Sequence, residues 1–393
     1  MSDDLLPAPT PRIQGWCPGA LQPMWAEDGW VVRVRPQGGR LSQSQAAGIA
    51  ALAARHALHT VELTSRANLQ LRGVAEAAYQ PLLDGLRQLG LVDADVHTES
   101  RRNMVLAPFW QAGDGSTAMA EALAQALASP QAPALPGKFG FALDAGAAPV
   151  LRATSADIRI ERLGPDYLVY ADGSPRGARA GAGEAVATAM ALAHWFVDAG
   201  GLTGPRRRMA ALLAGRTLPA QFTTTPVPSA APYSPPLGRA AQGYLVALEF
   251  GQLPVATLAA LAELAPLRLT PWRSLLLEGV QSLPAQPELI TLADDARLRI
   301  SACTGAPGCG QAAGVTRSLA RRLADALPTG QTLHVSGCTK GCAHPAQTLT
   351  VVATATGYNL IHHGNAAAAP DSVGWSPADL ATHLQQRLHA TPL

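Results

Sequence analysis

Four of the five cysteines lie in the last quarter of the chain, with a spacing that suits a metal centre. Cys303 and Cys309 are separated by five residues, and Cys338 and Cys342 by three. Thiolates bind zinc and iron–sulfur clusters. Structural zinc sites commonly use cysteine pairs separated by two residues, which neither pair here has. Glycines lie close to both pairs, and glycine lets backbone amides approach the sulfurs of a cluster. The pattern favours a [4Fe–4S] cluster, with a zinc site or four unligated thiols as alternatives.

A second group of candidates alternates along the chain near residue 70. Arg66, Asn68, Gln70 and Arg72 are spaced two apart, so on one continuous strand their side chains would share a face. Guanidinium groups bind carboxylates with two parallel hydrogen bonds, which makes this face suitable for a polycarboxylate ligand. The alternative is a strand face that is simply solvated.

Further polar candidates stand singly or in short runs. Arg101, Arg102 and Asn103 form a basic cluster, and Lys138 lies between glycines. His344 follows the last cysteine by two residues. This histidine is either a proton donor or iron ligand at the substrate, or a residue that orders the cysteine loop. The alternative for Arg101, Arg102 and Asn103 is a surface turn, and the alternative for Lys138 is an exposed lysine without a function.

The elements that position these residues form two similar halves. A strand at 29–35, a helix at 42–56 and a second strand at 60–73 are repeated at 243–249, at 254–264 and in a strand that ends at Gly279. The strings TSRANLQLRGV (64–74) and TPWRSLLLEGV (270–280) align without gaps. Apolar and turn positions recur, whereas the polar ones diverge. We interpret this as a duplication in which one copy kept the function.

A second pair of segments repeats in the same order. Hairpins at 157–170 and 349–361 are each followed by a helix, at 184–196 and 377–389. Hairpins mixed with crossover connections predict an α+β fold. The expected domains are a half-domain (1–90), an α/β domain (91–216), a Pro-rich linker (217–238), a second half-domain (239–290) and a cysteine-containing α/β domain (291–393).

Composition excludes several classes of protein. Hydrophobic residues make up 48% and charged residues 15% of the chain, which excludes a disordered protein. The net charge of +2 does not suggest a nucleic-acid binder. The acidic start, Met1–Asp4, lacks the features of a secretory signal, and prolines interrupt the longest charge-free stretch, so a cytoplasmic protein without a membrane span is expected. Neither a Rossmann fingerprint nor a P-loop is present, so electrons would come from an external donor.

Five motifs together resemble the sulfite and nitrite reductase superfamily over nearly the whole chain. They are the two cysteine pairs, the T-x-R-x-N-x-Q string at 64–70, Asn103 after Arg102, and the lysine loop at 135–139. The resemblance implies duplicated ferredoxin-like half-domains and two larger α/β units related by a pseudo-two-fold axis.

Within that superfamily, the precorrin-3B synthase family is the more similar branch. The motifs that carry this resemblance are Cys17-Pro18-Gly19, Lys138-Phe139-Gly140-Phe141 and Gly341-Cys342-Ala343-His344-Pro345. Sulfite reductases have a second lysine at the position of Gly140. Its absence disfavours sulfite chemistry, because reduction of a small anion needs several cations.

The resemblance implies a monooxygenase that converts precorrin-3A with O2, using electrons from a ferredoxin- or NADH-linked reductase. It implies that the four cysteines bind a [4Fe–4S] cluster and that Lys138 and His344 are catalytic. Because activation of O2 usually requires a metal or flavin and the sequence has no flavin motif, a further mononuclear iron near the substrate is a hypothesis. Arg66, Asn68, Gln70, Arg72, Arg101, Arg102 and Asn103 would bind the tetrapyrrole. The alternatives are a sirohaem-dependent reductase and a non-catalytic tetrapyrrole- or zinc-binding protein.

Overall fold

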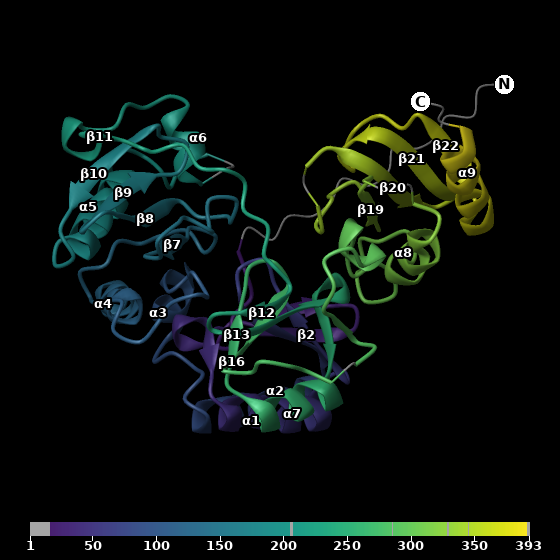
Figure 1. Cartoon of the computed structure of the whole chain (residues 1–393), viewed down its shortest axis with the longest axis horizontal. Coiled ribbons are helices and arrows are strands. Elements are labelled where there is room, and N and C mark those ends of the chain that lie inside the picture. Colours follow the sequence, from purple (N-terminus) through teal and green to yellow (C-terminus); the bar gives the residue numbers. More distant parts are fainter. Residues whose placement is uncertain (1–15, 205–206, 285, 328–329, 345, 391–393) are drawn as a thin grey trace. The chain divides into compact units, whose positions relative to one another are not determined.

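The computed structural model describes residues 16–204, 207–284, 286–327, 330–344 and 346–390 (Figure 1). The acidic start of the chain and Pro345 of the last motif lie outside the described residues. Two compact units are present. We call residues 15–24 and 30–289 the duplicated unit, and residues 25–29 and 290–393 the cysteine unit. Among the described residues, none of the helices is long and apolar enough to span a membrane.

The two predicted half-domains lie in the duplicated unit and have matching elements. The first contains β2 (Gly29–Val34), α1 (Gln43–His56), β4 (Thr60–Leu63), β5 (Leu69–Val74) and α2 (Glu76–Gln88). The second contains β12 (Gly238–Ala240), β13 (Gly243–Leu248), α7 (Val255–Leu264), β15 (Leu267–Leu269) and β16 (Ser274–Glu278). Helix α1 begins at Ser42, whose hydroxyl accepts from the amide of Gln45 while the Gln45 side chain accepts from the amide of Ser42.

The half-domains exchange short strands. Strand β3 (Arg40–Leu41), from the first copy, pairs with β15 of the second, and β14 (Gln252–Pro254), from the second copy, pairs with β4 of the first. The resulting sheet orders are β1-β2-β5-β4-β14, with β1 at Met24–Ala26, and β12-β13-β16-β15-β3, with β17 (Leu289–Ile290) beside β13. Each copy therefore completes the sheet of the other, and α1 packs beside α7.

The prediction of one continuous strand from residue 60 to 73 is wrong. The chain turns between β4 and β5, where the Thr64 hydroxyl accepts hydrogen bonds from the amides of Arg66 and Asn68, both at 3.3 Å. Ala67 has a φ of 52° in this turn. Consequently Arg66 lies in the turn, whereas Gln70 and Arg72 lie on β5. The four predicted side chains therefore do not all share one strand face. The second copy turns in the same way, with Thr270 in place of Thr64.

The larger α/β part of the duplicated unit is a six-stranded sheet. Strands β6 (Met104–Leu106), β7 (Phe141–Asp144) and β8 (Ile158–Leu163) are parallel, and β9 (Asp166–Ala171), β10 (Arg176–Ala180) and β11 (Thr225–Pro226) continue antiparallel. Its helices are α3 (Val96–Arg101), α4 (Ser116–Ala128), α5 (Ala185–Asp198) and α6 (Met209–Leu213). The segment expected to be only a linker contributes β11, and it buries Phe222 in this core.

The cysteine unit repeats this strand order. Strands β18 (Ile300–Ala302), β19 (Leu333–Ser336) and β20 (Thr348–Thr354) are parallel, and β21 (Gly357–Gly364) and β22 (Ser372–Trp375) follow antiparallel. Helix α8 (Arg317–Ala324) connects β18 to β19, as α4 connects β6 to β7. Helix α9 (Pro377–Ala390) follows the last strand, as α5 follows β10. Both predicted hairpin-and-helix segments are therefore confirmed.

Candidate functional site

Three loops of the duplicated unit meet where the parallel strands begin. Asn103 precedes β6, Gly140 precedes β7, and Asp157 precedes β8. Because the strands are parallel, their amino ends lie at one edge of the sheet. The side-chain Nδ2 of Asn103 donates to the carbonyl of Phe139 at 2.9 Å, and the backbone amide of Gly140 donates to Oδ2 of Asp157 at 2.9 Å. These bonds give the lysine loop at 135–139 a fixed course.

Arg66 extends from the β4–β5 turn to this edge. Its Nη2 donates to the carbonyl of Lys138 at 3.0 Å and to the hydroxyl of Ser155 at 3.4 Å. A Cβ at Gly140 would lie 3.1 Å from Arg66 Nη1 and 3.1 Å from the carbonyl oxygen of Asn103. A side chain at position 140 would therefore crowd the Arg66 guanidinium. Gly140 thus allows Arg66 to approach the lysine loop closely.

The loop that carries Cys17 is held by buried charged groups. Arg35 donates from Nη2 to the carbonyl of Pro18 at 3.2 Å. The Glu99 carboxylate accepts hydrogen bonds from the backbone amides of Ala20 and Leu21, at 2.6 to 3.2 Å. A Cβ at Gly19 would lie 1.9 Å from Glu99 Oε2, so glycine is needed there. The Cys-Pro-Gly string therefore fixes the position of the thiol.

Cations surround the Cys17 thiol. Burial opposes its ionisation, but the charges of Arg33, Arg66, Lys138 and Arg35 outweigh burial and lower the pKa of Cys17. The pKa of Arg66 is lowered as well, first by burial and then by repulsion from other arginines. Arg33 and Arg35 were not among the predicted site residues, although they alternate on the predicted strand at 29–35. This edge is therefore a positively charged site beside a thiol whose pKa is lowered.

We expect Cys17 to titrate below an ordinary cysteine. The rate of alkylation by iodoacetamide, followed from pH 6 to pH 9 by peptide mass spectrometry, should rise through a midpoint below about 8.5, because the thiolate is the reacting species. Arg66→Ala removes one of the cations and should move this midpoint upward. A midpoint at or above that of free cysteine would contradict the cationic surroundings.

Arg101 and Arg102 both have protein partners. Arg102 forms a bidentate ion pair with Asp93 at 2.8 and 2.9 Å, and the two side chains are only 6% and 7% exposed. Arg102 also donates to the carbonyl of Arg35 at 2.8 Å. Arg101 donates to the carbonyl of Ala132 at 3.1 Å. Arg102 is therefore a buried structural residue in this structure, and its predicted contact with substrate has no support from the geometry.

Replacing Arg102 tests this structural role. Arg102→Ala leaves the Asp93 carboxylate buried without its cation, which should destabilise the fold by about 3–5 kcal/mol. The midpoint of urea unfolding measures this loss. The double variant Arg102→Met/Asp93→Leu should recover much of the stability because neither charge remains. Unchanged stability combined with weaker substrate binding would restore the predicted binding role.

The remaining predicted residues of this region also have internal contacts. Gln70 accepts from Arg33 Nη2 at 3.1 Å and donates to Glu62 at 3.0 Å. Asn68 and Arg72 are buried, and Asn103 is occupied by the lysine loop. Among the predicted residues, the structure thus brings Arg66, Asn103 and the Lys138 loop together, whereas Gln70, Arg101 and Arg102 bond to other parts of the protein.

The second copy has an aromatic cluster at the equivalent turn. Trp272 occupies the position of Arg66 in the aligned strings. Its ring stacks on Phe109 with centroids 6.0 Å apart and an interplanar angle of 20°, and it contacts Tyr233 at 5.0 Å. Where the first copy presents a guanidinium, the second fills the space with rings. This contrast fits the interpretation that one copy retained the charged site.

The four cysteines of the predicted cluster follow the carboxyl ends of two neighbouring strands. Cys303 comes directly after β18, and Cys338 follows β19 by one residue. The pKa values of Cys338 and Cys342 are raised, first by burial and then by the charges of neighbouring cysteines in this set, while Lys340 opposes the shift. The four thiols therefore lie near enough to interact electrostatically.

The loops around these thiols suit a cluster. The amide of Gly337 donates to Sγ of Cys303 at 3.2 Å, the kind of bond that tunes cluster sulfurs. A Cβ at Gly337 would lie 2.6 Å from Ala312, so glycine allows the close approach of the two loops. Within the described residues, no three His, Cys, Asp or Glu side chains are placed to hold one metal ion. Four thiolates in Gly-rich loops nevertheless fit the donor set of a [4Fe–4S] cluster.

His344 lies against another histidine. Its ring centroid is 6.0 Å from that of His334, in an edge-on arrangement, and His334 is fully buried on β19. This contact favours the interpretation that His344 orders the cysteine loop.

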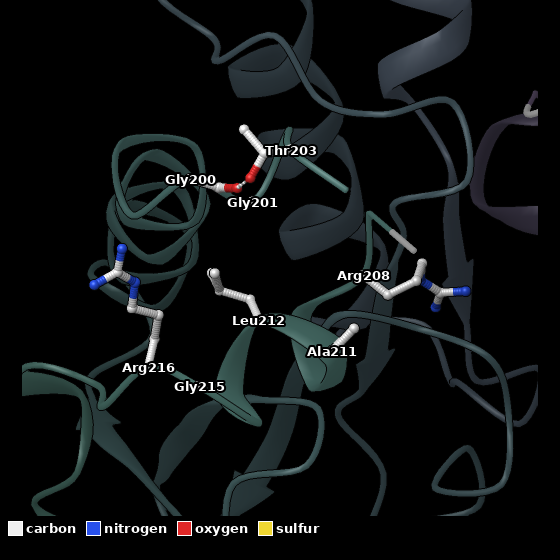
Figure 2. Close-up of a pocket in the computed structure, with 8 residues that line it drawn as sticks. All are labelled: Gly200, Gly201, Thr203, Arg208, Ala211, Leu212, Gly215 and Arg216. Carbon is white, nitrogen blue, oxygen red and sulfur yellow. Dashed lines mark hydrogen bonds between the residues drawn. The ribbon is translucent and has the colours of Figure 1, made fainter. Parts of the chain in front are cut away.

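A pocket of about 260 Å³ lies beside α5 and α6 (Figure 2). Its lining is Gly200, Gly201, Thr203, Arg208, Ala211, Leu212, Gly215 and Arg216. The volume is below the roughly 300–1,000 Å³ of typical ligand pockets, and is therefore too small for a tetrapyrrole. Figure 2 shows that Arg208 and Arg216 extend on opposite sides of Leu212.

Comparisons with known proteins agree with the fold and the motifs. Residues 26–89 match the family described as the nitrite/sulfite reductase ferredoxin-like half domain. A precorrin-3B synthase from Sinorhizobium sp is 29% identical over 395 residues, which cover 91% of this chain and 85% of the relative. Over nearly its whole length, this chain is therefore similar to a precorrin-3B synthase.

The solved structure of the NirA protein of Mycobacterium tuberculosis has the same fold. It matches with a TM-score of 0.59 and 17% identity, covering 92% of this chain and 80% of that chain. At this identity the similarity concerns the fold alone. The predicted α+β class with a ferredoxin-like half-domain is therefore confirmed.

Proposed function

We propose that this chain is a cytoplasmic precorrin-3B synthase of aerobic cobalamin biosynthesis. In the proposed reaction, precorrin-3A, O2, two electrons and two protons give precorrin-3B and water. One oxygen atom hydroxylates a meso carbon, and a ring acetate closes a lactone. The observation that carries this choice is Gly140, which packs closely against Arg66 and Asn103 at the position where a sulfite reductase has its second lysine.

Arg66 and Lys138 would bind the carboxylates of the macrocycle. Arg66 is fixed by its bonds to the lysine loop and to Ser155, so little conformational entropy is lost when a carboxylate binds. Lys138 would hold a carboxylate or deliver a proton at the reacting face. Asn103 would support the lysine loop through its hydrogen bond to Phe139, and Gln70 would hold Arg33. Arg72 and Arg101 would add positive charge to the binding region.

Cys303, Cys309, Cys338 and Cys342 would hold the [4Fe–4S] cluster. When bound, this cofactor supplies electrons one at a time. The electrons would come from a ferredoxin- or NADH-linked reductase. O2 chemistry usually requires a metal or flavin, so a further mononuclear iron belongs to the proposal. His344 would order the cysteine loop, or else transfer a proton.

Oxygen labelling tests the reaction. Protein isolated anaerobically is given precorrin-3A, a chemical reductant and ¹⁸O2, and the products are analysed by mass spectrometry. We expect one labelled oxygen atom in the lactone product and the other in water. Binding of precorrin-3A with no oxygen consumption would leave only a non-catalytic tetrapyrrole-binding protein.

A sirohaem-dependent sulfite or nitrite reductase is the second candidate. The fold shared with NirA favours it, and the same cationic edge would suit the carboxylates of sirohaem. This candidate predicts reduction of sulfite or nitrite by the isolated protein and bound sirohaem.

A further inference from the structure

We propose that Arg208 and Arg66 together form a clamp for one carboxylate of the tetrapyrrole substrate. The proposal rests on the proposed function and adds a residue that was not among the predicted site residues. Arg208 lies just before α6, more than 140 positions from Arg66 in the sequence, in a run of three arginines typical of a solvated turn.

The two guanidinium groups converge on one neutral acceptor. Arg208 Nη2 donates to the hydroxyl of Ser155 at 3.1 Å, and Arg66 Nη2 donates to the same oxygen at 3.4 Å. Ser155 itself is exposed, so the meeting point is open to a ligand. Two cations that share one hydroxyl repel each other, and a carboxylate at this position would bind both.

Arg208 is positioned by a buried carboxylate. Its Nε donates to Oδ1 and Oδ2 of Asp157 at 2.8 and 3.0 Å, and Asp157 is 1% exposed. Asp157 also accepts from the amides of Gly140 and Met209, at 2.9 and 2.8 Å. This carboxylate is thus shared among several donors. It fixes the direction of the Arg208 guanidinium and leaves its Nη2 pointing toward Ser155.

The hydrogen bonds of Arg66 leave a place for a directly bound anion. In the described part of the chain, the hydrogen bonds of its guanidinium go to a carbonyl and a hydroxyl, and neither is an anion. Burial and repulsion from Arg208 and Arg33 lower its pKa, whereas the charges of Cys17 and Asp157 raise it. A substrate carboxylate would form charge-assisted hydrogen bonds with both guanidiniums.

Anaerobic binding of precorrin-3A tests the clamp without turnover, because O2 is withheld. Quenching of tryptophan fluorescence would give the dissociation constant. A lost charge-assisted contact costs about 1.5–3 kcal/mol, which corresponds to a roughly 10- to 100-fold weaker dissociation constant for Arg208→Ala. Arg208→Lys keeps a cation beside Asp157 but lacks the several N–H donors of a guanidinium. It should therefore weaken binding less than Arg208→Ala does. Arg216→Ala is the matched control, since Arg216 borders the same pocket on the far side of Leu212 (Figure 2).

The double variant Arg66→Ala/Arg208→Ala distinguishes a shared carboxylate from two separate contacts. If both arginines bind one carboxylate, the combined loss in binding free energy should be smaller than the sum of the single losses. Arg208 variants that fold and bind like the wild type, with Arg66→Ala impaired, would overturn the clamp and leave the proposed function intact. Wild-type protein that does not bind precorrin-3A would overturn both. If Arg208→Ala fails to fold, Arg208→Lys decides by the same criterion.

Discussion

Cys309→Ser should abolish the visible absorbance of the iron–sulfur cluster and all activity that depends on external electrons. A serine hydroxyl is a poor substitute for a thiolate, and a cubane cluster requires four ligands. The cluster is expected to be lost from the folded protein, because Cys309 lies in a loop held independently by backbone hydrogen bonds. Absorbance near 400 nm, together with iron and sulfide analysis of anaerobically purified protein, measures the effect.

Cys17→Ser is the matched control for the cluster. It removes the cysteine that lies in the duplicated unit and should leave iron and sulfide unchanged. Retention of a complete cluster in Cys309→Ser would remove Cys309 from the ligand set and contradict the assignment of the four cysteines.

Arg66→Ala should weaken anaerobic binding of precorrin-3A by roughly 10- to 100-fold, the equivalent of about 1.5–3 kcal/mol for a charge-assisted hydrogen bond. The reason is that Arg66 is the predicted binding residue that the structure brings directly against the lysine loop. Arg66→Lys should restore only part of the affinity because lysine cannot form the bidentate pair.

The control for Arg66 is Arg179→Ala, which removes a surface arginine paired with Asp166. Exposed pairs contribute little to stability, so this variant should bind like the wild type. An unchanged dissociation constant in Arg66→Ala would mean that Arg66 is a solvated or structural residue, and would remove the main cation from the proposed binding site.

Local patterns predicted most of the elements. The hairpins at 157–170 and 349–361 were evident because alternating apolar residues flank a turn that contains glycine. The turn between β4 and β5 was missed because it contains neither glycine nor proline, and Ala67 adopts a positive φ that its residue type does not indicate. The exchanged strands β3 and β14 were missed as well, since strands of two or three residues that pair across copies leave no local signal.

The site was predictable only in part for a similar reason. Arg66 and Lys138 belong to motifs, and the structure brings them together. Arg102 belongs to a motif too, but Asp93 captures it in a buried ion pair, and burial cannot be inferred from a run of charged residues. Arg208 gave no signal, because its position depends on Asp157, some fifty residues earlier in the chain. Arg33 could have been found, since it alternates with Arg35 on a predicted strand.

The most direct test of the account is the cofactor content of anaerobically purified protein, measured as iron, acid-labile sulfide, zinc and extractable sirohaem. The account predicts the iron and sulfide of one [4Fe–4S] cluster, with additional iron for a mononuclear site and no sirohaem. Stoichiometric sirohaem would contradict it in favour of a sulfite or nitrite reductase, and zinc without sulfide would exclude both redox functions.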